Sequence, residues 1–193
     1  MALTTGSDTG EYRRSDNTIH TMRDLNIIQY NCGNANNSKA RPFLDSINPK
    51  EYPIIALQEP IITERNPHST YYPKNYQLSR EIKFGVKVIF LIYNKIPLTR
   101  WKVIEATEFI EHLQIQLEED TLDIINVYNP PGPANKLRIS KWKQLKPILQ
   151  NLADNHTLVI GDFNIHHLEW ARIILRREPK ADHLLIRMKS LHF

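Results

Sequence analysis

The chain has 193 residues, 41% of them hydrophobic and 24% charged. This composition is typical of one globular domain and excludes a wholly disordered, collagen-like or coiled-coil protein. The apolar stretches, such as Ile54–Leu57 and Val86–Tyr93, stop at strand length, well short of the roughly 18 residues of a membrane helix. The formal net charge of +4 gives a mild bias toward polyanionic partners.

The first residues and the cysteine content indicate where the protein resides. Residues 1–23 are polar and turn-rich, so we expect a disordered leader there and one domain over residues 24–193. The leader lacks the apolar core of a secretory signal, and Cys32 is the single cysteine, which excludes an internal disulfide. These features favour an intracellular protein of the cytoplasm or nucleus, with Cys32 as a small core residue.

The first half of the domain predicts a strand, a helix and a strand. Leu25–Asn31 has a strand pattern, and Ser38–Ile47 can form a short helix with one apolar side. Pro53–Glu59 is apolar on both faces, so this strand is expected to be covered on both sides. The turn-rich stretch 60–76 contains three prolines and is interpreted as a functional surface loop.

The second half predicts further strands followed by helices. Leu113–Leu117 alternates with period two, which is typical of a sheet that is wet on one face. The other predicted elements are strands over Val86–Tyr93, Leu122–Asn129 and Thr157–Ile160, and helices over Asn135–Leu152 and about Pro179–Leu191. In the first of these helices Trp142, Leu145, Leu149 and Leu152 share one face. The interleaved order indicates the α/β or α+β class.

Polar side chains follow three of the predicted strands at the points where they end. They are Asn31, Glu59, and Asp162 with Asn164. Rigid strand ends can aim side chains into a common crevice, and carboxylate and amide oxygens suit Mg²⁺ or Mn²⁺ better than Zn²⁺. The set therefore indicates phosphate chemistry. Taken singly, each of these residues is also a common turn former at a strand end.

Four motifs occur in a fixed order along the chain. They are Gln29-Tyr-Asn31, Leu57-Gln-Glu-Pro60, Asn126-Val-Tyr-Asn-Pro-Pro-Gly132, and Gly161-Asp-Phe-Asn-Ile-His-His167 with Trp170. Together they resemble the endonuclease/exonuclease/phosphatase superfamily, and more narrowly the apurinic-type endonuclease domain of non-LTR (LINE-type) retrotransposons of fungal type. The resemblance implies a deoxyribonuclease-I-like four-layered sandwich, in which two packed β-sheets are flanked by helices.

The resemblance also implies a role for each strand-end residue. Asn31 and Glu59 would hold the divalent metal, Mg²⁺ or Mn²⁺, with Glu59 as the direct carboxylate ligand. Tyr128 would contact the scissile phosphate, whereas its alternative role is that of a core-packing tyrosine. Asp162 would orient or deprotonate the attacking water, and Asn164 would position that water or bind phosphate. His166, His167 and Trp170 are given loop or structural roles.

The sequence departs from the family pattern at its end. Family members continue to a second aspartate and a terminal Ser-Asp-His motif, whereas this chain stops at Phe193. Asp182 and His183 resemble that motif but lie in the predicted last helix, where they form an exposed pair. We therefore expect a partial domain that is C-terminally truncated, binds Mg²⁺ weakly and cleaves DNA poorly or not at all.

Three functions remain open on the sequence. The leading one is a metal-dependent DNA endonuclease of retrotransposon type that acts on the DNA phosphate backbone, without a membrane partner and in an oligomeric state that the sequence does not indicate. The first alternative is a phosphatase of the same superfamily that acts on a non-nucleic-acid phosphoester. The second is a non-catalytic nucleic-acid-binding remnant, whose salt-sensitive binding would depend on its lysines.

Overall fold

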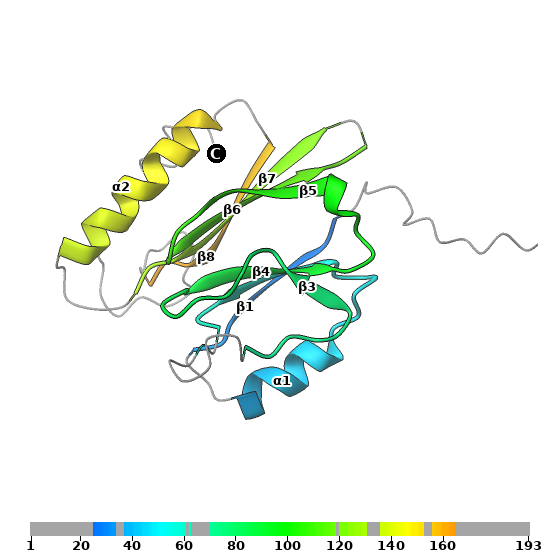
Figure 1. Ribbon diagram of the computed structural model, residues 1–193. Coiled ribbons are helices and arrows are strands. Elements are labelled where there is room, and N and C mark those ends of the chain that lie inside the picture. The colour runs from blue at the N-terminus through cyan, green and yellow to red at the C-terminus, as the bar shows by residue number, and fades with distance from the viewer. Residues whose placement is uncertain are drawn as a thin grey trace, which may run out of the picture.

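Two β-sheets pack face to face and carry a helix on each outer side (Figure 1). The computed structural model describes residues 25–33, 37–60, 62, 70–118, 120–130, 136–152 and 156–164. Within these residues each sheet has four strands. The four layers are therefore helix, sheet, sheet and helix, as the family resemblance implied.

The first sheet has the strand order β1-β2-β4-β3. Its elements are β1 (Ile27–Asn31), α1 (Asn37–Ser46), β2 (Ile54–Gln58), β3 (Tyr76–Leu78) and β4 (Val88–Tyr93). Strands β1 and β2 are parallel and joined through α1, whereas β4 runs antiparallel to both of its neighbours. The whole of β2 is buried, because one face packs under α1 and the other against the second sheet.

The second sheet has the strand order β5-β6-β7-β8. Its elements are η1 (Leu98–Arg100), β5 (Trp101–Ala106), β6 (Ile110–Gln116), β7 (Thr121–Tyr128), α2 (Lys136–Asn151) and β8 (His156–Asp162). Strands β5, β6 and β7 form an antiparallel meander, and β8 returns through α2 to lie parallel to β7. Leu145, Ile148 and Leu149 seat α2 on the outer face of this sheet.

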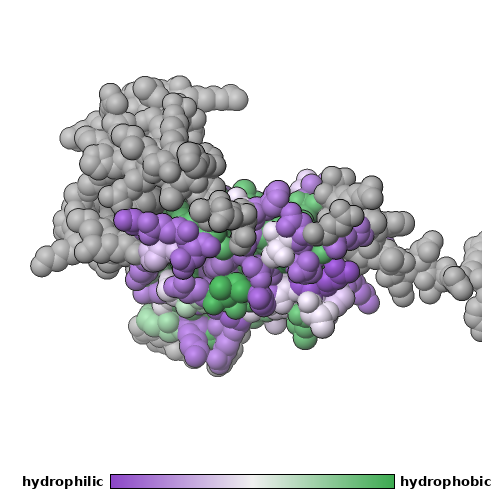
Figure 2. All heavy atoms as spheres, turned by 90° about the horizontal axis from the view of Figure 1, so that it is seen from above, coloured by the Kyte–Doolittle hydropathy of each residue, from purple (hydrophilic) through white to green (hydrophobic). Residues whose placement is uncertain are grey.

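The layer between the sheets is the main apolar core. The first sheet contributes Ile54, Ala56, Phe90 and Ile92, and the second contributes Leu113, Ile115 and Ile124. Burying one aliphatic or aromatic side chain of this size contributes about 1.5–3 kcal/mol. The coloured residues on the face seen in Figure 2 are mostly hydrophilic, with green hydrophobic residues in small separate patches. Neither described helix is long and apolar enough to cross a bilayer.

The predicted elements are confirmed within the described residues, with boundary shifts of a few residues. The sequence patterns missed β3 and β5, two edge strands that are short or mostly exposed. Stretch 60–76, predicted as a loop, has no helix or strand before β3 among its described residues. The predicted leader, the predicted last helix and the side chain of Trp142 lie outside the description.

Gly161 allows β8 to approach β7 closely. It has φ +144, and a Cβ built there would lie 1.9 Å from the backbone oxygen of Val127. A backbone atom cannot rotate away, so Gly161→Ala is expected to lower the free energy of unfolding by about 3 kcal/mol or more in urea titrations. Gly33→Ala is the matched control, because Gly33 has φ +59 and a Cβ there would meet no atom of the described residues within 4 Å, so its substitution should cost about 1 kcal/mol. Equal losses in the two variants would contradict this account.

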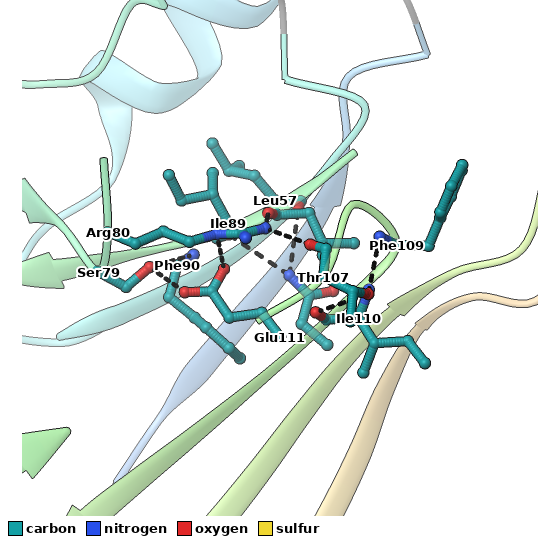
Figure 3. Close-up of polar contacts among 11 residues, drawn as sticks. Leu57, Ser79, Arg80, Ile89, Phe90, Thr107, Phe109, Ile110 and Glu111 are labelled. Atoms are coloured by element: carbon teal, nitrogen blue, oxygen red, sulfur yellow. Dashed lines mark hydrogen bonds and ion pairs between the residues drawn. The ribbon is translucent and has the colours of Figure 1, made fainter. Parts of the chain in front are cut away.

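A buried polar cluster ties the loop after β3 to the first residues of β6 (Figure 3). Glu111 has no exposed side-chain surface, and its Oε2 lies 3.3 Å from Nε of Arg80. The Ser79 hydroxyl donates to the Glu111 carboxylate. Arg80 also donates to the carbonyls of Val88 and Thr107, at 2.8 Å each. The cluster therefore joins the two sheets by charged and polar contacts.

The Glu111 carboxyl is expected to make stability depend on pH. Burial raises its pKa to about 7, against the opposing effect of Arg80. Between the ordinary pKa of 4.5 and about 7, the folded protein holds a proton that the unfolded chain has released. The free energy of unfolding contributed by this group therefore falls as the pH rises through that window.

Glu111→Gln tests this linkage directly. Urea unfolding at pH 5 and pH 8 should show a smaller loss of stability with rising pH in the variant than in the wild type, because the variant carries no proton to release at this position. An identical pH dependence in the two proteins would show that Glu111 does not titrate in this range.

Candidate active site

The ends of four strands meet at one edge of the sandwich. Asn31 ends β1 and Glu59 directly follows β2, the parallel neighbour of β1. Tyr128 and Asp162 end β7 and β8, and they are register partners in that parallel pair. Because contacts also run between the sheets, from β1 to β8 and from β2 to β7, the four side chains fall into one neighbourhood.

Two hydrogen bonds across the sheets connect these strand ends. Nδ2 of Asn31 donates to Oδ2 of Asp162 at 2.6 Å. The Tyr128 hydroxyl donates to Oε1 of Glu59, also at 2.6 Å. Each bond joins one strand of the first sheet to one strand of the second. The structure therefore brings Asn31, Glu59, Tyr128 and Asp162 together, on one side of the molecule.

Glu59 has an uncommon backbone conformation. Its φ is +49, in the left-handed region that a glutamate rarely adopts. The strand hydrogen bonding of β2 ends here, and the Glu59 amide donates to the carbonyl of Lys87 at 2.8 Å. Non-glycine residues held in this region cost about 1–3 kcal/mol and cluster at functional sites. The conformation turns the side chain of Glu59, a residue that is 9% exposed, toward the Tyr128 hydroxyl.

Tyr128 is held both by packing and by charge. Its side chain is 4% exposed and its ring stacks on Phe109, with centroids 6.4 Å apart. Burial raises its pKa well above the usual range, and the hydrogen bond and charge of Glu59 and the charge of Asp162 raise it further. The phenol therefore stays protonated near neutral pH and can donate a hydrogen bond to an anionic oxygen.

The turn after β8 fixes Asp162 and Asn164. The Asn164 amide donates to Oδ1 of Asp162 at 3.0 Å, and Nδ2 of Asn164 donates to the carbonyl of Asn129 at 2.8 Å. Asn129 in turn donates from Nδ2 to the carbonyl of Phe163 at 2.6 Å. Asn164 has φ +47, which asparagine tolerates better than most residues. These contacts orient the Asp162 carboxylate with two donors already in place.

The donor set fits a hard divalent cation. Glu59 offers a carboxylate oxygen, Asn31 offers an amide oxygen that also accepts from the Gly33 amide at 2.8 Å, and the Asp162 carboxylate lies beside Asn31. The described residues contain no group of three or more His, Cys, Asp or Glu side chains placed for a metal. Mg²⁺ does not require such a group, because it is usually bound through one or two carboxylates and keeps several waters.

Several residues around the site received no role in the sequence analysis. Gln29 accepts from the Gly161 amide at 3.2 Å, Asn129 braces the turn after β8, and Gln58 and Asn126 bond to each other between the sheets. All four lie within or next to the recognised motifs. The sequence feature that could have revealed them is an amide side chain inside or just after a strand that is otherwise apolar.

The remaining candidates either play a core role beside the site or lie outside the residues that the structure describes. His166, His167, Trp170, Asp182 and His183 are among the residues that the structure does not describe. Cys32 is 5% exposed and lies in the core under α1, which confirms the expectation that it is a small core residue. Burial and the nearby Glu59 charge raise its pKa to about 11, which keeps it an unreactive thiol.

Comparisons with known proteins agree with this arrangement. A family model described as endonuclease-reverse transcriptase matches residues 122–191, a range that includes Tyr128, Asp162 and Asn164. The endonuclease domain of TRAS1, a telomere-specific non-LTR retrotransposon, has a similar structure, with a TM-score of 0.64 at 16% identity over 87% of this chain and 71% of that chain. The fold is therefore similar to that of the TRAS1 endonuclease domain, as the resemblance to the endonuclease/exonuclease/phosphatase superfamily implied. The sequence resemblance to this superfamily is confirmed.

Two other solved structures have a similar fold. A β-hairpin deletion mutant of beta toxin from Staphylococcus aureus has a TM-score of 0.52 at 13% identity, over 84% of this chain and 71% of that chain. Truncated TDP2 from Caenorhabditis elegans has a TM-score of 0.50 at 11% identity, over 80% of this chain and 68% of that chain. No curated protein sequence matches this chain.

Proposed function

We propose that this chain is a Mg²⁺- or Mn²⁺-dependent phosphodiesterase that cleaves DNA, of the retrotransposon endonuclease type. The observation that carries the proposal is the meeting of Glu59, Asp162 and the Tyr128 hydroxyl at the ends of strands from both sheets. The family model over residues 122–191 and the similarity to the TRAS1 endonuclease domain support a nuclease assignment. The net charge of +4 is compatible with a polyanionic substrate.

The residues divide into metal-binding and phosphate-facing groups. Glu59 would hold the cation through its carboxylate, and Asn31 would hold it through its amide oxygen. When bound, the cation neutralises charge that develops on the phosphate and on the leaving oxygen. The strained backbone of Glu59 supports this role, because conformations of this kind persist where function requires a particular aim of the side chain.

The phosphate-facing groups perform the proton transfer and bind the oxyanion. Asp162 takes a proton from water, whose oxygen then forms a bond to phosphorus as the bond to the leaving oxygen breaks. The single Tyr128 hydroxyl proton, which is donated to Glu59 in this structure, would be donated to a non-bridging phosphate oxygen instead once substrate is bound and charge gathers on that oxygen. Asn164, fixed by Asn129, orients the water or the phosphate. The domain over residues 24–193 is proposed as the unit that carries this site.

A plasmid assay tests the proposal and separates it from both alternatives. The purified full chain should convert supercoiled plasmid to nicked circles in Mg²⁺ or Mn²⁺ at a low rate, because its sequence predicts weak Mg²⁺ binding and poor cleavage, and excess EDTA should stop the conversion. A phosphoinositide offered in parallel should not be hydrolysed. Salt-sensitive DNA binding without metal-dependent nicking would instead support the non-catalytic remnant, and hydrolysis of the phosphoinositide alone would support the phosphatase.

A further inference from the structure

We infer that Gln58 and Asn126 form a buried pair of positioning residues that sets the spacing between Glu59 and Tyr128. The inference rests on the proposed function of those two side chains as metal ligand and phosphate contact. The pair itself faces neither solvent nor substrate, since both residues have no exposed surface. The pair can therefore affect the site only by fixing the positions of the strand ends that carry Glu59 and Tyr128.

The contacts of the pair span the two sheets. Nε2 of Gln58 donates to Oδ1 of Asn126 at 2.6 Å. Nδ2 of Asn126 reaches back to the first sheet and donates to the carbonyls of Leu57 at 3.0 Å and Ile89 at 3.4 Å. Figure 3 shows Leu57 and Ile89 beside this inter-sheet region. One amide on β7 thus holds two neighbouring strands of the opposite sheet.

The pair lies directly behind the site in sequence and in space. Gln58 immediately precedes Glu59, and Asn126 lies two residues before Tyr128 on the same face of β7. In front of it, the Tyr128 hydroxyl bonds to the Glu59 carboxylate at 2.6 Å. A change in the distance between β2 and β7 at Gln58 and Asn126 would therefore also change the distance between the Glu59 carboxylate and the Tyr128 hydroxyl, which lie only one and two residues away along the chain. Functional groups must be held within about 0.5 Å to act.

The amides are costly to bury, which favours a geometric role over a stabilising one. Elsewhere the same layer is filled by aliphatic and aromatic side chains. Oε1 of Gln58 is buried and has no hydrogen-bond partner among the described residues. A buried polar atom without a partner lowers stability, and matched apolar side chains in place of both partners can be neutral or stabilising. Stability alone would therefore favour an apolar pair at these positions.

The test separates stability from metal binding with Gln58→Met, Asn126→Leu and the double variant of the full chain. Each single variant should lower Tm by several degrees, because it leaves the other amide unpaired in the core. The double variant should recover much of that Tm. Its dissociation constant for Mn²⁺, measured by electron paramagnetic resonance, should remain raised by about tenfold, as for other groups that orient metal ligands. Its kcat for DNA should fall similarly, with KM little changed.

A control pair lies at the far end of the same layer. Ile92→Val with Ile115→Val should lower Tm and leave Mn²⁺ affinity at the wild-type value, because these residues contact neither strand end of the site. If the double amide variant recovers both Tm and Mn²⁺ affinity, the pair is merely structural and the inference is overturned. If the wild type itself binds no Mn²⁺, the proposed function falls, and this inference falls with it.

Discussion

Asp162→Asn is expected to lower the rate of DNA cleavage by about 10²- to 10⁴-fold, the range that a positioned general base contributes. The substitution removes the carboxylate that takes the proton from water and keeps nearly the same shape. Asp162 accepts from Asn31 and from the Asn164 amide, and an asparagine oxygen can still accept one of these bonds. Circular dichroism and urea unfolding should therefore show that the variant is folded. The plasmid nicking assay should show that its kcat has fallen.

Asp120→Asn is the matched control for this experiment. Asp120 lies before β7, at the opposite end of that strand from Tyr128, and its half-exposed side chain is 3.0 Å from His156. The change in charge is the same, so any general effect on DNA attraction should appear in both variants. A rate in Asp162→Asn as high as that in Asp120→Asn would remove Asp162 from the mechanism.

Glu59→Gln is expected to weaken Mn²⁺ and Mg²⁺ binding on the order of 100-fold, because these cations are bound through one or two carboxylates and Glu59 is the proposed direct ligand. The amide oxygen of glutamine can still accept the bond from the Tyr128 hydroxyl, so the fold and its Tm should change little. Isothermal titration with Mn²⁺ measures the affinity, and a melting curve measures the stability.

The same substitution at an exposed glutamate provides the reference. Glu118 is exposed and lies just after β6, at the end of that strand remote from the site, so Glu118→Gln should leave Mn²⁺ affinity unchanged. Should Glu59→Gln bind Mn²⁺ as tightly as Glu118→Gln, the cation is not held by Glu59, and the proposed metal site is misplaced.

Sequence patterns predicted the central strands and the edge strands β1 and β8, but not the edge strands β3 and β5. The apolar runs in β2, β4 and β7 are long because these strands are covered on both faces, and burial leaves a clear pattern. Strands β3 and β5 lie at sheet edges. β3 is three residues long and most of β5 is exposed. Such segments form strands because they pair with a neighbouring strand, and this pairing cannot be predicted from the local sequence pattern.

The residues of the proposed site could be named from the sequence, whereas the contacts that support them could not. Polar side chains at strand ends marked Asn31, Glu59 and Asp162, since parallel strands bring their carboxyl ends to one edge. The hydrogen bond of Gln58 to Asn126 crosses 68 positions of the chain, so no local spacing reveals it. The positive φ of Glu59 is equally hidden, because glutamate is not a residue that signals a left-handed turn.

The central claim is that one hard cation binds beside the strand ends where Glu59 and Asp162 meet. Anomalous X-ray scattering from crystals of the full chain soaked in Mn²⁺ tests it most directly. We expect one strong peak within about 2.0–2.3 Å of a Glu59 carboxylate oxygen, which is lost in crystals of Glu59→Gln. A Mn²⁺ peak elsewhere on the molecule, with none at Glu59, would contradict the claim.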